Sequence, residues 1–272
     1  MNDVETFERD GVVRLPGVID AGWIDRMRTA VDCEVDTPAV VDLSAMAPAP
    51  PVGGSPRGQF RAGTDHWIAA PEFLAFARDT PIPRIVAELL ASERIWLYED
   101  SVLVKDPGTR ERTVFHQDLA YFHVDGEQVC TVWIPLDAVD AANGAVRYVR
   151  GSHRDRTSFR PNLFVTTDSL PGTEGVDVPD HTDDPALVHF DTAPGDIVVH
   201  HARTIHGAFA NTTPDRPRRA LSIRYAGDDA RFRIKPGAPQ KPHHASLVEG
   251  EPLTEPACPR VWPLSDGVAA RR

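Results

Sequence analysis

The sequence predicts a mainly β protein with flanking helices, built around a jelly-roll barrel. Short apolar stretches with a period of two recur between residues 94 and 226, which is the period of half-buried strands. The 25 Pro and 19 Gly are spread along the 272 residues and supply frequent turns. Helical periodicity is confined to the first third of the chain. Short antiparallel strands preceded by helices favour one domain over residues 1–272.

Composition restricts the classes of partner. The net charge of −11 argues against binding to nucleic acid or an anionic membrane, because phosphate groups require a basic face. No apolar run is long enough to span a bilayer. The three cysteines lie far apart without a CxxC motif, which disfavours a disulfide framework and fits a reducing compartment. We therefore expect a cytoplasmic protein that acts on a small molecule.

Residues 1–93 are predicted to be a mainly helical buttress. Asp20 is a suitable N-cap for a first helix, because apolar residues with helical spacing follow it. A second amphipathic helix begins near Pro83, with apolar residues on one face. The Pro- and Gly-rich residues 46–58 predict a loop. Both helices are expected to cover the outside of a sheet.

Residues 94–226 are predicted to form the jelly-roll core. Strands are expected at residues 95–98, 102–104, 128–136, 146–149, 187–190, 197–200 and 220–225, with a further strand through His116 in the stretch 113–122. In the strand at 128–136, Thr131 and Trp133 share one face, and Cys130, Val132 and Ile134 take the other. Residues 160–186 lack a period and predict a long loop that is a possible lid. Residues 227–272 are expected to be an irregular C-terminal tail.

His116 and Asp118 stand two residues apart at the end of an apolar run. On a strand such residues point to the same face, so an imidazole and a carboxylate can converge on one ion. Two histidines and one carboxylate, with open positions, are the ligand set of non-haem Fe(II) oxygenases. The His-x-Asp pairs that begin at His153 and His181 lie in polar surroundings typical of solvated loops. His116 alone is embedded among apolar residues.

A second histidine ligand has four candidates, namely His189, His200, His201 and His206. Because His200 and His201 are adjacent on one strand, at most one of them faces a pocket, and a core or rim histidine is the simpler interpretation.

Arg218 follows His206 by twelve residues and opens a strand. It shares a face with Ala220 and Ser222, whose small side chains leave room beside the guanidinium. A fork-shaped, permanently charged donor suits the far end of a dicarboxylate. The residues alone leave open a second interpretation, in which Arg216, Arg218 and Arg219 form a solvated basic turn.

An ordered set of motifs resembles the phytanoyl-CoA dioxygenase family, whose members are Fe(II)- and 2-oxoglutarate-dependent oxygenases. The resemblance covers roughly residues 95–226. It rests on His116-Gln117-Asp118, Trp133, Asn143-Gly144, Gly151-Ser152-His153, Gly195-Asp196, His206-Gly207, Asn211 and Arg218. It implies a double-stranded β-helix (cupin-like jelly roll) that uses Fe(II), 2-oxoglutarate and O₂. It implies His116, Asp118 and His206 as iron ligands, with Arg218 pairing with the C5 carboxylate of 2-oxoglutarate.

The resemblance also suggests further co-substrate contacts. Trp133 and Ser101 match residues that line the co-substrate site in the family. Thr131 shares the face of Trp133, so we add it as a hydrogen-bond donor, and Gln117 is a further candidate contact. Lys105, Arg61, Trp67 and His123 are other residues that can reach a pocket, without a ranking among them.

Two positions depart from the family pattern. Ala208 stands where some members have Ser, which predicts the loss of one co-substrate hydrogen bond. The spacing from His206 to Arg218 is one residue longer than expected, so Arg219 is an alternative partner for the carboxylate. Asp118 is intact, which argues against a halogenase, because halogenases have a small residue there.

We expect hydroxylation of an unactivated C–H bond of a small metabolite, for example in secondary metabolism, with release of succinate and CO₂. Two alternatives stay open: a non-catalytic jelly-roll protein that binds a metal or ligand, or the same oxygenase chemistry ending in desaturation, cyclisation or epimerisation. Residues 168–184 carry six acids and no Lys or Arg. If this loop closes as a lid it favours a neutral or cationic substrate; a solvated loop without a ligand role is equally compatible.

Overall fold

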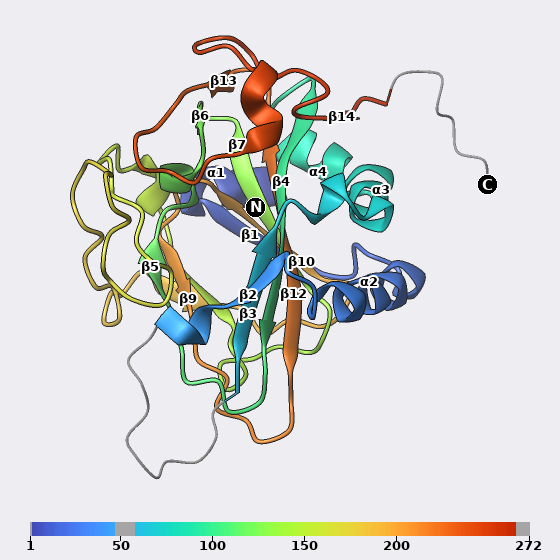
Figure 1. Ribbon diagram of the computed structural model, residues 1–272, viewed down its shortest axis with the longest axis vertical. Helices are drawn as coiled ribbons and strands as arrows, with labels where there is room; N and C mark the ends of the chain where they lie inside the picture. The colour runs from blue at the N-terminus through green and yellow to red at the C-terminus, as the bar shows by residue number, and fades with distance from the viewer. Residues whose placement is uncertain (1, 47–57, 265–272) are drawn as a thin grey trace.

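Two antiparallel sheets form the body of the protein (Figure 1). The computed structural model describes residues 2–46 and 58–264, so nearly all of the loop expected at 46–58 lies outside the described residues. In spatial order, the large sheet contains β1 (Val12–Leu15), β10 (Ile197–His201), β7 (Val129–Pro135), β12 (Arg218–Ala226), β4 (Ile95–Lys105), β3 (Phe60–Thr64) and β2 (Val40–Asp42), with β14 (Arg260–Trp262) also paired to β4. The small sheet contains β5 (Thr113–His116), β11 (His206–Ala208), β8 (Val146–Val149) and β9 (Leu187–His189). A separate pair joins β6 (Val124–Asp125) to β13 (Arg231–Phe232).

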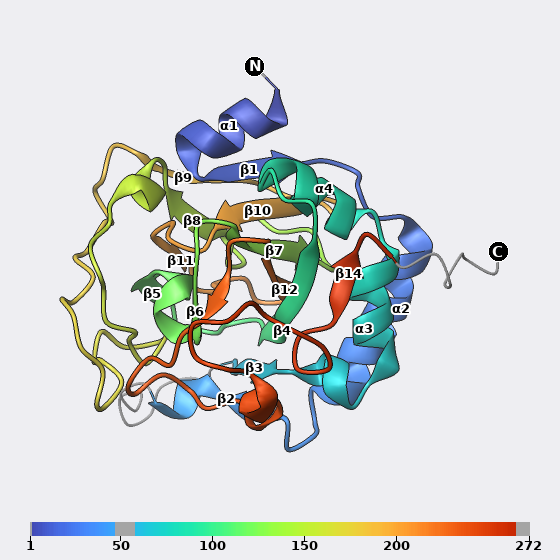
Figure 2. The ribbon, with the colours of Figure 1, turned by 90° about the horizontal axis from the view of Figure 1, so that it is seen from above.

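Helices cover the face of the large sheet that points away from the small sheet (Figure 2). The α-helices are α1 (Asp3–Asp10), α2 (Ala21–Glu34), α3 (Pro71–Asp79) and α4 (Ile82–Leu89). The 3₁₀ turns are η1 (Leu43–Met46), η2 (His66–Ile68), η3 (Asp118–Tyr121), η4 (Ser152–Arg154) and η5 (Pro242–Ser246). The Asp20 side chain accepts from the Trp23 amide at 3.0 Å, which confirms the predicted N-cap of α2. No helix in the described ranges has the length and apolar character needed to cross a membrane.

The alternation predicted for β7 is confirmed. Cys130, Val132 and Ile134 belong to the main core between the large sheet and the helices. Trp133 and Thr131 point into the space between the two sheets, where Trp133 packs with residues of both sheets. The large sheet therefore has two buried faces, one apolar and one that carries the polar groups of a site.

β12 is the strand that aligns these polar groups, because it pairs with β4 on one side and with β7 on the other. Ser222 lies opposite Ser101 on β4 and opposite Trp133 on β7. Two residues further along, Arg224 lies opposite Thr131. Side chains from three strands thus share one layer inside the barrel.

The structure differs from the sequence predictions at several elements. The two strands expected at 95–98 and 102–104 are one strand, β4, with an irregularity opposite Arg224 and Tyr225. Between them, Glu99 and Ser101 point into the barrel, where Glu99 pairs with Arg224 and Ser101 accepts a hydrogen bond from it, whereas Asp100 points to the helix-covered face and bonds to the Trp67 amide. The segment expected to be mainly helical also supplies β1, β2 and β3, and the segment expected to be an irregular tail supplies β13 and β14. These strands are short, and their pairing partners decide their conformation.

Candidate metal and co-substrate site

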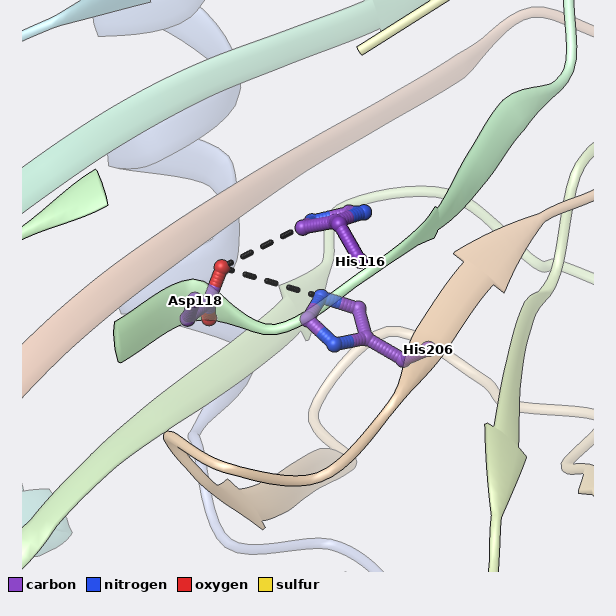
Figure 3. Close-up of side chains that lie close together, drawn as sticks. All are labelled: His116, Asp118 and His206. Carbon is purple, nitrogen blue, oxygen red and sulfur yellow. Dashed lines mark ion pairs between the residues drawn. The ribbon is translucent and has the colours of Figure 1, made fainter. Parts of the chain in front are cut away.

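Three side chains predicted as metal ligands converge between the sheets (Figure 3). His116 ends β5, Asp118 begins η3, and His206 opens β11, where it is the register partner of His116. One ligand atom from each lies within 4.8 Å of the others. The Nε2 atoms of both histidines are 3.7 Å from Asp118 Oδ1. All three residues are buried, and among the described residues they form the one group of such side chains arranged so that it could hold a metal ion.

The hydrogen bonds of the two histidines determine which nitrogen faces the centre. His116 Nδ1 lies 2.8 Å from the Val114 carbonyl oxygen, and His206 Nδ1 lies 2.9 Å from the Thr204 carbonyl oxygen. A carbonyl only accepts, so each Nδ1 carries the proton and each Nε2 has a free lone pair. His116 Nε2 is buried without a hydrogen-bond partner in the described chain. Burial, together with the neighbouring histidines, lowers the pKa of His206 well below its ordinary value, so its ring is in the neutral form that binds metals.

The two carboxylate oxygens of Asp118 have different neighbours. Oδ1 faces the two imidazoles, while Oδ2 accepts from Thr131 Oγ1 at 2.5 Å and from His200 Nε2 at 3.1 Å. Burial alone would raise the pKa of Asp118, but the hydrogen bond from His200 and the charge of the nearby Arg224 guanidinium help to hold that pKa well below its usual range. The carboxylate is therefore ionised and fixed in orientation. Such partners around a ligand set its geometry and basicity.

Arg218 lines the same pocket as the three histidine and carboxylate groups. Its side chain is almost fully buried, with Nη1 at 3.4 Å from the Leu103 carbonyl oxygen and Nε without a partner in the described chain. Burial lowers the pKa of Arg218 to about 10, which leaves it charged at neutral pH. Arg219 points away and pairs with Asp137 at 2.8 Å and Asp32 at 2.9 Å. The structure thus places Arg218, and not Arg219, beside the candidate metal ligands.

The remaining predicted contacts fall into two groups. Trp133 lines the pocket, as does Ala208 at the position where a hydroxyl was expected to be missing. Thr131 donates to Asp118, and Ser101 Oγ accepts from the Arg224 guanidinium, so both have partners within the protein. Gln117 lies elsewhere: its Nε2 donates to the Arg203 carbonyl oxygen at 2.7 Å, and it lines a different surface pocket. Because of this placement we do not retain Gln117 as a co-substrate contact.

The four unranked residues do not line the metal pocket. Lys105 is buried next to it and donates to two backbone carbonyls, those of Glu111 and Phe209. The others have partners elsewhere: Arg61 with Asp36 and Asp106, Trp67 with His243, and His123 with Pro239 and Lys235.

Several pocket residues were not singled out by the sequence analysis, among them Arg224 and Phe164, and His200 was left as one of four histidine candidates. The alternation along β12 that places Arg218 and Ser222 on one face also predicts Arg224 there, so that signal was present. For His200, the sequence showed only that His200 or His201 can face inward. Phe164 belongs to the long loop after residue 160, and its ring lies 5.0 Å from the ring of His116. A loop without periodicity gives no signal for such a contact.

Residues 7–220 match the family model described as Phytanoyl-CoA dioxygenase (PhyH). The chain belongs to the phytanoyl-CoA dioxygenase family. This membership, together with the jelly-roll fold of the structural relatives, confirms the family and the fold class predicted from the sequence. Iron- and 2-oxoglutarate-dependent oxygenases are found among both the curated and the structural relatives.

Curated relatives of this PhyH-family chain align over part of their length. A probable alpha-ketoglutarate-dependent hypophosphite dioxygenase of Stutzerimonas stutzeri is 32% identical over 139 residues, covering 51% of this chain and 47% of the relative. A phytanoyl-CoA dioxygenase of Arabidopsis thaliana is 25% identical over 148 residues, covering 53% and 49%. The chain therefore spans about half the length of the curated relatives it matches.

Solved structures align over nearly the whole chain. The non-haem alpha-ketoglutarate-dependent carbocyclase SnoK from nogalamycin biosynthesis is 27% identical, with a TM-score of 0.71 over 95% of this chain and 94% of that chain. The epimerase SnoN, in complex with Fe3+, alpha-ketoglutarate and nogalamycin RO, is 25% identical, with a TM-score of 0.69 over 95% and 97%. EctD from S. alaskensis, at 19% identity and a TM-score of 0.66 over 92% and 84%, shows the shared fold alone.

Proposed function

We propose that this protein is an Fe(II)- and 2-oxoglutarate-dependent dioxygenase that oxidises a small molecule. His116, Asp118 and His206 would hold the iron, and Arg218 would bind the C5 carboxylate of 2-oxoglutarate. One observation carries the assignment: the Nε2 atoms of two buried histidines and one carboxylate oxygen face the same point, beside a buried arginine. Two neutral nitrogens and one carboxylate suit Fe(II), and they leave the remaining coordination positions open.

The residues of this chain bind, orient and shield. Val114 and Thr204 fix the histidine rings through their carbonyl groups, while Thr131 and His200 fix the Asp118 carboxylate. When bound, the iron and 2-oxoglutarate supply the oxidising chemistry with O₂, and succinate and CO₂ are released. The protein contributes position and a water-poor cavity.

Phe164 is the residue we propose as the cover of the pocket. Its ring packs against His116 and lies 6.1 Å from the ring of Phe60, which lines the pocket. Its backbone has φ of 69°, an uncommon conformation for a bulky residue, and is held by a hydrogen bond from Val114 N to the Phe164 oxygen at 3.0 Å. This placement supports a lid role for the loop at 160–186.

The proposed reaction is hydroxylation of an unactivated C–H bond. Cyclisation or epimerisation is the second candidate, because the similar structures include a carbocyclase and an epimerase. A neutral or cationic substrate stays a prediction. Some of the loop acids have partners within the loop, since Asp177 pairs with Arg160 at 2.6 Å and Asp184 pairs with His181 at 2.9 Å, which reduces the charge offered to a ligand. A cytoplasmic location also stays a prediction.

An anaerobic titration tests the assignment without knowledge of the substrate. Addition of Fe(II) and 2-oxoglutarate to the metal-free protein should produce the weak visible charge-transfer absorption of a 2-oxo acid chelated to Fe(II). Asp118→Ala should abolish this absorption and 2-oxoglutarate-dependent succinate formation in air, while the circular dichroism spectrum stays that of the wild type. Substantial succinate formation by the variant would contradict the ligand assignment. Absorption without succinate in the wild type, across a substrate panel, would favour the non-catalytic alternative.

A further inference from the structure

A second buried arginine faces the pocket from the same strand as Arg218. Arg224 lies six residues along β12, on the same face, and only 7% of its surface is exposed. It lines the same pocket as Arg218 and the three candidate metal ligands. Between the two arginines this face carries only Ala220 and Ser222. The strand therefore presents two guanidinium groups separated by small side chains.

The two guanidinium groups reach toward each other along the strand. Arg218 Nη1 lies 3.4 Å from the Leu103 carbonyl oxygen, and Leu103 is opposite the residue two positions after Arg218. Arg224 Nη1 donates to the Ser222 carbonyl oxygen at 3.0 Å, two positions before Arg224. The Arg218 guanidinium thus lies at the level of Ala220 and the Arg224 guanidinium at the level of Ser222. These two levels are about 7 Å apart along a strand. A five-carbon dicarboxylate that lies along this face can therefore meet a different guanidinium with each of its carboxylates.

Arg224 has an unused hydrogen-bonding edge. Its contacts to Ser101 Oγ, to the Ser222 oxygen and to Glu99 Oε1 all use Nη1. Nε is buried without a partner among the described residues, and Nη2 has no hydrogen bond to them. An Nε–Nη2 edge is one of the two forks by which arginine binds a carboxylate bidentately. Because Arg224 is buried and lines the pocket, an acceptor within the pocket can reach this edge.

A buried ion-pair chain fixes Arg224 in position. The second oxygen of Glu99 pairs with Lys241 Nζ at 2.5 Å, and Lys241 Nζ pairs with Asp65 at 2.7 Å. The chain therefore connects η2 and η5 to the pocket through β4 and β12. The two carboxylates and the two cationic groups of this chain balance in charge, so these ion pairs hold the Arg224 guanidinium in place without a ligand. Such preorganisation lowers the cost of binding an anion.

Arg224 also lies beside the candidate metal ligands. Its register partner on β7 is Thr131, whose hydroxyl donates to Asp118. Arg218 is at the opposite end of the four-residue face. An acid whose far carboxylate meets Arg218 thus has its other end near Arg224 and the metal position.

We propose that Arg224 binds the C1 carboxylate of 2-oxoglutarate, so that Arg218 and Arg224 hold the two ends of one dicarboxylate. The inference rests on the proposed function, because it takes 2-oxoglutarate as the co-substrate. A carboxylate has two oxygens, so the C1 group can bind the metal through one and accept from Arg224 through the other. Arg224 is then a catalytic residue that touches the co-substrate.

Two 2-oxo acids separate the roles of the arginines in a binding experiment without O₂. 2-Oxopentanoate has the same chain length as 2-oxoglutarate and the same C1 end, but lacks the C5 carboxylate. The dissociation constant of each acid is measured on the Fe(II)-loaded protein from the visible charge-transfer absorption and from quenching of tryptophan fluorescence. R218K should weaken 2-oxoglutarate binding about 10- to 100-fold and leave 2-oxopentanoate nearly unchanged. R224K should weaken both acids by the same factor, about 10- to 100-fold.

The variants are chosen to keep the fold. Lysine at position 224 retains the charge next to Glu99 but lacks the fork, and R224Q is a second variant that retains a donor for Ser101. R219K is the matched control, because Arg219 is on the same strand, faces the opposite side and pairs with Asp137. Its dissociation constants should equal those of the wild type. Circular dichroism and Fe(II) binding verify that each variant is folded.

Three outcomes would overturn the proposal. If both folded Arg224 variants bind the two acids as the wild type does, Arg224 does not contact the co-substrate, and the proposed function stands. If they weaken 2-oxoglutarate alone, Arg224 acts on the C5 end instead. If the wild type binds neither acid, the proposed function fails and this inference fails with it.

Discussion

Thr131→Val removes one hydroxyl from the surroundings of the candidate metal site and leaves the shape of the side chain nearly unchanged. Thr131 is fully buried, and its hydroxyl donates to Asp118 Oδ2 at 2.5 Å. A hydrogen bond to a charged group contributes about 1.5–3 kcal/mol. His200 Nε2 still donates to the same oxygen at 3.1 Å, so the carboxylate keeps part of its support. We therefore expect the lower end of this range, which is about a tenfold loss of Fe(II) affinity.

The assay is an anaerobic Fe(II) titration against a competing chelator. Thr131→Ser restores the hydroxyl and should recover most of the affinity. Thr80→Val is the matched control, because the Thr80 hydroxyl is also buried but bonds to Phe76 O at the end of α3, away from the site. If Thr131→Val binds Fe(II) as tightly as the wild type and the control, Thr131 does not orient a metal ligand, and the reasoning about Asp118 is wrong.

Two further predictions concern stability and the pocket. Burial raises the pKa of Asp100 to about 7, so the folded state binds the Asp100 proton more tightly than the unfolded state does. The stabilisation that comes from this bound proton is fully present below about pH 4 and is lost as the pH rises through 7. Asp100→Asn should remove this pH dependence and raise the unfolding free energy at pH 8 by roughly 4 kcal/mol relative to the wild type. Urea unfolding at pH 5 and pH 8 tests this, and an equal loss of unfolding free energy between the two pH values in both proteins would contradict it. Phe164→Ala should open the pocket to water and raise succinate formation without substrate severalfold. Phe159→Ala is the control and should leave that rate unchanged, because Phe159 precedes the loop and does not line this pocket. Unchanged succinate formation in Phe164→Ala would refute the cover role.

Residue spacing along a strand predicts which side chains of the candidate site point in the same direction. His116 and Asp118 are two residues apart, and backbone geometry alone brings their side chains to one side. The same rule placed Thr131 and Trp133 inside the barrel. The same rule places Arg224 on the face of Arg218. The period does not indicate how far along the strand the pocket extends. Periodicity therefore predicted faces correctly along single strands.

Pairing between distant strands could not be read from periodicity. His206 meets His116 because β11 pairs with β5, and Arg218 lines the pocket because β12 lies between β4 and β7. The short strands β1 and β14 take their conformation from partners far along the chain. In isolation such segments have too few residues to show a period, and their backbone hydrogen bonds are made only in the assembled sheet.

The sequence by itself determined the strand-rich fold class, the family resemblance and, through that resemblance, the identity of the candidate metal ligands, because each depends on residue types in a fixed order along the chain. The tertiary structure decided which arginine enters the pocket, that His200 and Thr131 share one oxygen of Asp118, and that Gln117 points elsewhere. Those outcomes depend on which side chains meet across strands and on which polar groups find partners once water is excluded. Both conditions exist only when the chain is folded.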